Sequence, residues 1–131
     1  MNFVSDTIKL VPVMTTTTVD TERDAKDQVS DFTTLGEADG SGYSSGGTTL
    51  SNKAVNVDDA NDRAECDADD ATRSAFGACS APIQGELVIK HVTNLNSSLP
   101  LHFLEYASNK TPDGSDMVVV INAEGYIQGT S

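Results

Sequence analysis

We expect the rest of the chain to be arranged about the stretch from Gly42 to Asp70, GYSSGGTTLSNKAVNVDDANDRAECDADD. It opens with a turn rich in glycine and serine, alternates from Thr48 to Asp58, turns at DDAND and alternates again from Asp62 to Asp67. Two short alternating runs separated by turn residues predict a β-hairpin. Because successive side chains of a strand point to opposite faces, Val55 and Val57 should share one face. We expect a half-buried antiparallel pair with its other face in solvent.

The first expected strand of the chain is DTIKLVPVM, from Asp6 to Met14, with Ile8 and Leu10 on one face. Pro12 lies within this strand. Because proline cannot donate a ladder hydrogen bond, we expect Pro12 at a sheet edge or at the end of the strand. The run of threonines that follows reads as a loop.

The segment from Asp20 to Phe32, DTERDAKDQVSDF, has charged residues at helical spacing, and either Asp20 or Thr21 is suited to be its N-cap. It is expected to form one short surface helix or, alternatively, an irregular loop. In the glycine-rich turn that follows, we expect Tyr43 to be anchored by packing, with its hydroxyl at a polar rim. The small, polar segment from Ala71 to Pro82 reads as a connector over one end of the sheets.

Two strongly apolar segments, Gly85 to Thr93 and Leu99 to Tyr106, flank the loop NLNSSL and predict a second hairpin. A simple register about that loop gives three cross-strand pairs: His91 with His102, Ile89 with Leu104 and Leu87 with Tyr106. The second face of the hairpin would carry Val88, Val92, Leu101 and Phe103. Since both faces are largely apolar, we expect another sheet to cover one of them and a neighbouring molecule or a loop to cover the other.

The last core strand is predicted at DMVVVIN, buried on both faces, after the turn TPDGSD, and EGYIQGTS closes the chain as a short strand and tail. The whole pattern predicts an all-β chain with about seven to eight short antiparallel strands. The fold class is therefore a β-sandwich or a small barrel, with room for one short surface helix. A length of 131 residues indicates a single domain, residues 1–131, with extended termini.

Composition limits the partners. The formal net charge is −12, from 20 acidic and 8 basic residues. Nucleic-acid binding depends on neutralising phosphates with Lys and Arg, so no nucleic-acid partner is expected. The chain is 37% hydrophobic and 5% aromatic without any Trp, which indicates a modest core that self-association would complete. No apolar run approaches the roughly 18 residues of a membrane-spanning helix, so no membrane partner is expected.

The two cysteines are Cys66 and Cys79. Cys66 occupies a position of the first hairpin expected to face inward, and it reads as a small core hydrophobe. A disulfide between the two is the less favoured alternative, because the start MNFVSDTIKL lacks the features of a signal peptide and indicates synthesis in a reducing cytoplasm.

Four motifs are distributed along nearly the whole chain: DTIKL, GSGYSSGGTTLSNKAVNVDDANDRAECDADD, ELVIKHVTN and INAEGYIQ. Together they resemble the pattern of a family of small virion proteins encoded by tailed bacteriophages. The motifs are turns and strands, so the resemblance implies a virion structural protein and leaves its place in the particle open. Cys66 stands where the family pattern usually has a bulky apolar residue.

Candidate metal sites are incomplete. The segment EADGSGY places oxygen-bearing side chains at Glu37, Asp39 and Ser41, like the first half of a calcium loop, but its twelfth position is Thr48 instead of a bidentate acid. A solvated turn is the favoured interpretation. A second candidate is the acidic group at the two ends of the first hairpin, which consists of Asp58, Asp59, Asp62, Asp67, Asp69 and Asp70. Such charge clusters are usually a solvated face.

The proposed register makes His91 and His102 cross-strand neighbours, but a zinc site needs three or four ligands and neither cysteine has a suitable spacing. No nucleophile-elbow or phosphate-binding motif occurs in the sequence. We therefore predict no catalytic residue, no metal and no cofactor, and a protein that is not an enzyme.

Two functions remain open. The favoured one is a capsid decoration (cement) protein on the outer head surface of the virion, bound to the major capsid protein and to copies of itself, with a trimer favoured. The alternative is a tail-associated structural or adsorption component, such as part of a tail tube, baseplate or fibre. The outer surface of the head is favoured because a strongly acidic protein there faces solvent and has no contact with the packaged DNA.

Overall fold

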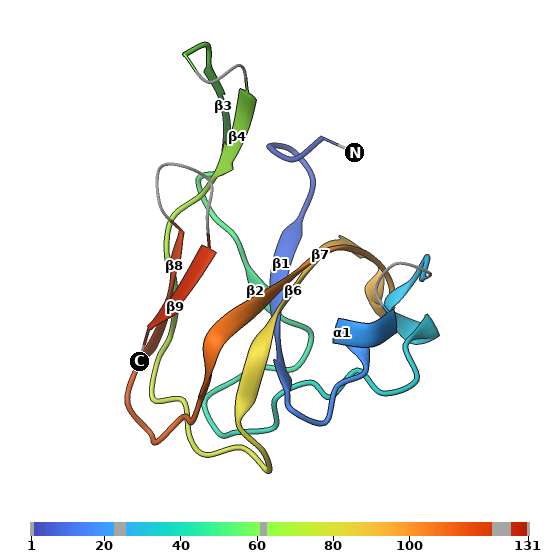
Figure 1. The fold of residues 1–131 in the computed structure, drawn as a ribbon, viewed down its shortest axis with the longest axis vertical. Helices are drawn as coiled ribbons and strands as arrows, with labels where there is room; N and C mark the ends of the chain where they lie inside the picture. Colours follow the sequence, from blue (N-terminus) through green and yellow to red (C-terminus); the bar gives the residue numbers. More distant parts are fainter. Residues whose placement is uncertain (1, 23–25, 61–62, 122–126, 131) are drawn as a thin grey trace.

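The computed structural model describes residues 2–22, 26–60, 63–121 and 127–130, which form strands and two short helical turns (Figure 1). The all-β prediction is confirmed. The elements in chain order are β1 (Ile8–Met14), α1 (Val19–Glu22), the 3-10 helix η2 (Val29–Asp31), β2 (Thr48–Thr49), β3 (Ala54–Asp58), β4 (Arg63–Asp67), β5 (Ala71–Arg73), β6 (Ile83–Val92), β7 (Asn94–Lys110), β8 (Met117–Ile121) and β9 (Ile127–Thr130).

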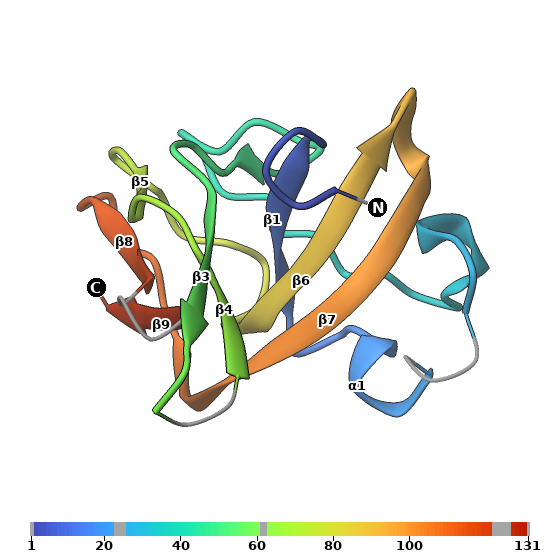
Figure 2. The ribbon, with the colours of Figure 1, turned by 90° about the horizontal axis from the view of Figure 1, so that it is seen from above.

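Within the described ranges, the strands form three antiparallel sheets. The largest has the order β2-β1-β6-β7, a second has the order β5-β8-β9, and β3 and β4 pair with each other alone. Seen from above, the long strands β1, β6 and β7 lie between the β5-β8-β9 sheet on one side and α1 on the other (Figure 2). The sheets remain open, so the sandwich alternative is the one realised.

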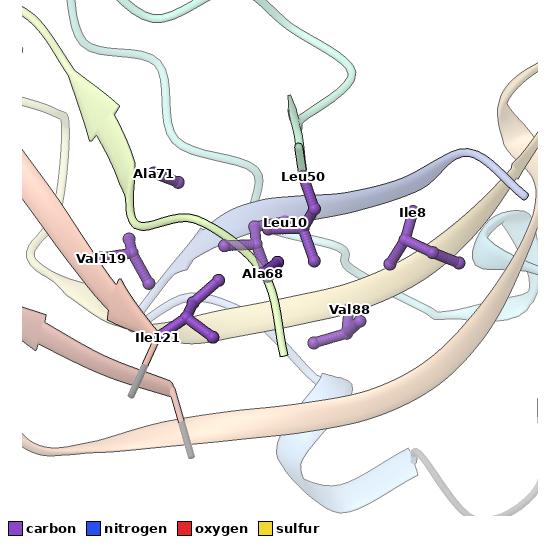
Figure 3. Packing of buried hydrophobic residues seen from close by; sticks show 8 residues of the cluster. All are labelled: Ile8, Leu10, Leu50, Ala68, Ala71, Val88, Val119 and Ile121. Carbon is purple, nitrogen blue, oxygen red and sulfur yellow. The ribbon is translucent and has the colours of Figure 1, made fainter. Parts of the chain in front are cut away.

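The core between the two larger sheets holds residues from both (Figure 3). It consists of Ile8, Leu10, Leu50, Ala68, Ala71, Val88, Val119 and Ile121. Ile8 and Leu10 share a buried face as their alternation predicted. In β8, Met117, Val119 and Ile121 are buried, while Val118 and Val120 are only half-buried, so this strand is not buried on both faces as expected.

The opposite face of the large sheet has its own core, which explains why β6 reads as apolar on both faces. Val19, Val29 and Phe32, from the α1 and η2 segment, cover a set of buried sheet residues: Val11, Val13, Leu87, Ile89 and Phe103. Both faces of β6 are therefore covered, the second by the chain itself, but the expectation fails at the turn end of the hairpin, where Val92 and Leu101 are exposed. The expected surface helix is instead a four-residue α1 that begins at Val19, ahead of both proposed N-caps, because its apolar side chain is buried against the sheet.

The register of the second hairpin differs from the prediction. The expected loop NLNSSL is the start of β7, and the chain reverses at Thr93, whose φ of 57° permits a tight turn. Irregularities at Val88/Ile89 and Lys90/Val92 then shift the pairing. As a result His102 lies opposite Val88, Ile89 opposite Pro100 and Leu87 opposite Phe103, so His91 and His102 are not paired.

Two further expectations are wrong for reasons of packing. Pro12 lies in β1, which is an inner strand of the sheet. It is tolerated there because β2 pairs only with Lys9 and Leu10, so no strand needs an N–H from Pro12 on that side. The Pro12 carbonyl accepts the Ala38 N–H at 2.9 Å. The segment from Ala71 to Pro82 is more than a polar connector. It begins with β5, and Phe76 within it is fully buried.

The first hairpin forms as predicted, with Val55 opposite Cys66 and Val57 opposite Ala64. Its environment differs from the prediction. Figure 1 shows β3 and β4 projecting from one end of the molecule, and the side chains of Val55 and Val57 are 48% and 74% exposed. The half-buried pair expected from alternation is therefore an exposed arm, because no other sheet of the described residues lies against the valines. The Cys66 side chain is outside the described part of the structure, and Cys79 is free.

Both termini have local structure in their described parts. The Asp6 N–H donates to the Asn2 carbonyl at 2.8 Å, which closes a turn ahead of β1. At the other end, β9 pairs with β8 from Val118↔Thr130 to Ile121↔Ile127. Residues 122–126, which include the start of the expected EGYIQGTS strand, lie outside the described residues.

Candidate functional site

The main buried polar cluster joins the two larger sheets. Arg73, on β5, is 3% exposed, and Glu86, on β6, is fully buried. The guanidinium Nη2 lies 2.6 Å from Glu86 Oε1, and Nη1 lies 2.9 Å from Oε2. The remaining donors of Arg73 reach Thr48 Oγ1 at 3.1 Å and the Leu10 carbonyl at 3.2 Å. Each nitrogen of the guanidinium therefore has an acceptor.

Two tyrosines complete this cluster. Tyr106 Oη donates to Glu86 Oε2 at 2.7 Å, and the Tyr43 ring lies 5.7 Å from the Arg73 guanidinium carbon. Burial, assisted by Glu86, raises the pKa of Tyr106 above its ordinary value. Burial opposes the charge of Arg73, but the Glu86 carboxylate outweighs it, so the pKa of Arg73 is raised.

These contacts suit a structural cross-link. The two charges compensate each other and the lone pairs of Glu86 point to donors within the cluster, so the carboxylate is already occupied as an acceptor. Sequence reasoning missed this pair, because Arg73 lies in a segment that reads as polar connector. The signal that could have found it is Glu86 itself, the single acid in the apolar run GELVIK.

The candidate calcium loop is a turn organised by Glu37. Its Oε2 accepts the Tyr43 hydroxyl and the Gly46 N–H, both at 2.7 Å, and its Oε1 accepts the Ser45 hydroxyl at 2.8 Å. The Tyr43 ring stacks on Phe76 at a centroid distance of 5.7 Å. The prediction that packing anchors Tyr43 is thus confirmed. The second acid of this segment, Asp39, accepts the Ser80 N–H at 2.8 Å, so both acids are engaged with protein donors.

Two acids near the first hairpin accept hydrogen bonds from other parts of the chain. Asp69 accepts the Asn52 side-chain amide at 2.5 Å, and Asp70 accepts the Ile121 N–H at 2.7 Å. Asp59 is exposed at the turn. Asp62 and the Asp58 side chain lie outside the described residues. Across the described ranges, no group of three or more His, Cys, Asp or Glu is placed to hold a metal ion.

The two histidines are separated by the shifted register. The backbone N–H of His91 donates to the Thr7 carbonyl at 2.8 Å, and its Nδ1 is buried without a hydrogen-bond partner among the described residues. His102 is exposed on β7. A shared site for these imidazoles is therefore not present in the described structure.

Glu22 provides a testable pH dependence. Its carboxylate accepts the Thr18 hydroxyl at 2.5 Å and the Thr33 hydroxyl and N–H at 2.6 and 2.9 Å, and these hydrogen bonds lower the pKa of Glu22 from 4.5 to about 2. Because the folded value is depressed, this stabilisation is complete above pH 4.5 and is lost as the pH falls toward 2. We expect Glu22→Gln to lower the melting temperature at about pH 6 and to match the wild type at about pH 2. A carboxyl NMR titration of Glu22 with its midpoint near 4.5 would contradict this account.

Large apolar side chains are exposed in two places. One is the β3–β4 hairpin, with Val55 and Val57. The other is the turn end of β6 and β7, where Val92, Leu99 and Leu101 are 37%, 38% and 38% exposed. Val4 is a separate exposed valine near the N-terminus.

Comparison with known proteins returns no match to a family model, to a curated protein or to a solved structure. Within the part of the chain that the structure describes, no helix has the length and apolar character needed to span a membrane. The candidate sites are therefore interpreted from their own chemistry. The buried Arg73–Glu86 pair connects two sheets, and Val55 and Val57 form an exposed apolar surface on the first hairpin.

Proposed function

We propose that this chain is a virion structural protein of a tailed bacteriophage, and more narrowly a capsid decoration protein on the outer surface of the head. It binds the major capsid protein and stabilises the shell. The resemblance of DTIKL, the Gly42 to Asp70 hairpin region, ELVIKHVTN and INAEGYIQ to small phage virion proteins carries this proposal.

The chemistry of the described polar groups supports a structural role. The side chains of Arg73, Glu86, Glu37 and Asp70 are each hydrogen-bonded to groups that hold sheets or turns together. The net charge of −12 suits an exterior position, where solvent ions screen the protein, better than a position against packaged DNA.

A multimer, with a trimer favoured, belongs to the proposal because a closed ring would place the same patch of each copy on equivalent capsid subunits. The cover that α1 and η2 provide for the second face of the large sheet removes one reason for self-association. The remaining argument for a multimer is that a shell repeats the same binding surface around its symmetry axes. Sedimentation of the free protein measures the number of copies directly.

The deciding experiment incubates the purified protein with emptied shells, with tailless heads and with separated tails, and measures co-sedimentation. A parallel gel shift at low salt uses a double-stranded DNA fragment. We expect saturable binding to shells and heads and no DNA complex. Binding to tails alone would replace the decoration role by the tail-associated alternative, and a salt-sensitive DNA complex would overturn both.

A further inference from the structure

The β3–β4 hairpin is attached to the body at its base. Leu50 and Ala68, on the two sides of that base, are 4% and 8% exposed and belong to the core between the sheets. The Asp69 N–H donates to the Ser51 carbonyl at 2.9 Å, and the Leu50 N–H donates to the Ile8 carbonyl at 2.9 Å. The hairpin therefore leaves the body from a fixed point.

Beyond this base the hairpin is a separate two-stranded sheet that projects from the body (Figure 1). An isolated pair of strands is only marginally stable in water, and exposed valines add an apolar surface that water does not favour. Val55 and Val57 occupy alternate positions of β3 and are both largely exposed. A partner that covers this face would bury the valines and stabilise the pair of strands.

Charge indicates the chemistry of that partner. From Lys53 to Asp70 the sequence contains seven acidic and two basic residues. A second copy of the hairpin would bring like charges together, which opposes pairing between copies. A surface with an apolar slot bordered by Lys and Arg would match both the valines and the acids.

We propose that the β3–β4 hairpin is the arm by which this protein docks on its shell, with Val55 and Val57 entering an apolar slot rimmed by basic residues of the major capsid protein. This inference rests on the decoration role proposed above and assigns the binding to the capsid to one part of the chain, the β3–β4 hairpin. The slot buries the valines, and the basic rim pairs with the acidic hairpin, so the affinity falls as ionic strength rises.

The test compares shell binding of the wild type with that of the double variant Val55→Thr/Val57→Thr. Threonine is also β-branched, so it keeps the strand preference of these positions while it replaces a methyl group by a hydroxyl. The matched control is Val4→Thr, since Val4 is 50% exposed and lies outside the hairpin. We expect the double variant to bind on the order of tenfold or more weakly, with an unchanged melting temperature, and the control to bind like the wild type.

Hydrogen exchange on the wild type supplies a measurement that needs no variant. Amides of residues 54–58 and 63–67 should exchange rapidly in the free protein and slowly on the shell. Equal shell binding by the double variant and the wild type, or unchanged exchange on the shell, would overturn the docking arm and leave the decoration role standing. A wild type that binds no shell would overturn both. A free wild-type dimer that the double variant converts to a monomer would show that a second copy, instead of the capsid, occupies the hairpin.

Discussion

The Val119→Asp variant is expected to be unfolded or to form inclusion bodies. Val119 is fully buried in the middle of β8 and belongs to the core between the two larger sheets, together with Leu10, Ala71 and Ile121. A carboxylate there would lose its hydration without gaining a charged partner, and such burial costs several kcal/mol, roughly 3 or more. Since small domains are stable by only about 5–15 kcal/mol, one such change removes most of the margin.

Circular dichroism and urea unfolding measure this effect. Asp59→Asn is the matched control: Asp59 is exposed at the turn of the first hairpin, so we expect this variant to unfold within about 0.5 kcal/mol of the wild type. A Val119→Asp protein that is soluble and unfolds with the cooperativity of the wild type would show that β8 is not part of the core.

The Arg73→Met variant is expected to lose about 3–5 kcal/mol of unfolding free energy. Methionine fills much of the volume of the arginine side chain but removes the cation, so Glu86 would remain buried without its bidentate partner. Thr48 and the Leu10 carbonyl would also lose a donor. The loss of unfolding free energy arises because the Glu86 carboxylate stays buried and unpaired. It is therefore larger than the stability that the intact salt bridge adds over a pair of uncharged side chains.

The double variant Arg73→Met/Glu86→Gln separates these two contributions. Glutamine has the shape of glutamate and leaves a neutral oxygen for the Tyr106 hydroxyl. We expect the double variant to be more stable than Arg73→Met, because no unpaired charge is buried. Urea unfolding of the wild type, of Arg73→Met, of Glu86→Gln and of the double variant gives the coupling energy. A single variant that loses less than about 1 kcal/mol would mean that water reaches Glu86 and that the cluster does not connect the sheets.

The sequence provided an argument against a calcium site more readily than it revealed the buried Arg73–Glu86 cluster. Thr48 at the twelfth position was enough to argue against calcium, since a local spacing rule applies to a local loop. The Arg73–Glu86 pair joins β5 to β6, and the Tyr106 hydroxyl reaches it from β7. Because no spacing rule connects these strands, only their packing reveals the cluster.

The features that could be predicted from the sequence are local ones. Alternation and turn residues were sufficient to predict the all-β class, the β3–β4 hairpin and the strands β1, β6 and β8, because the pleat repeats every two residues and glycine-rich turns interrupt it. The two-sided apolar pattern of β6 also correctly predicted that both of its faces are covered.

The environment of each strand face depends on how the sheets pack, which local patterns do not specify. Alternation cannot distinguish a valine that meets a second sheet from one that meets solvent, so Val119 is buried while Val57 is exposed. The tight turn at Thr93 and the irregularities that follow decide the β6–β7 register, which a symmetric loop had placed incorrectly. The α1 and η2 segment packs on the second face of the large sheet because this contact removes Val19, Val29 and Phe32 from water.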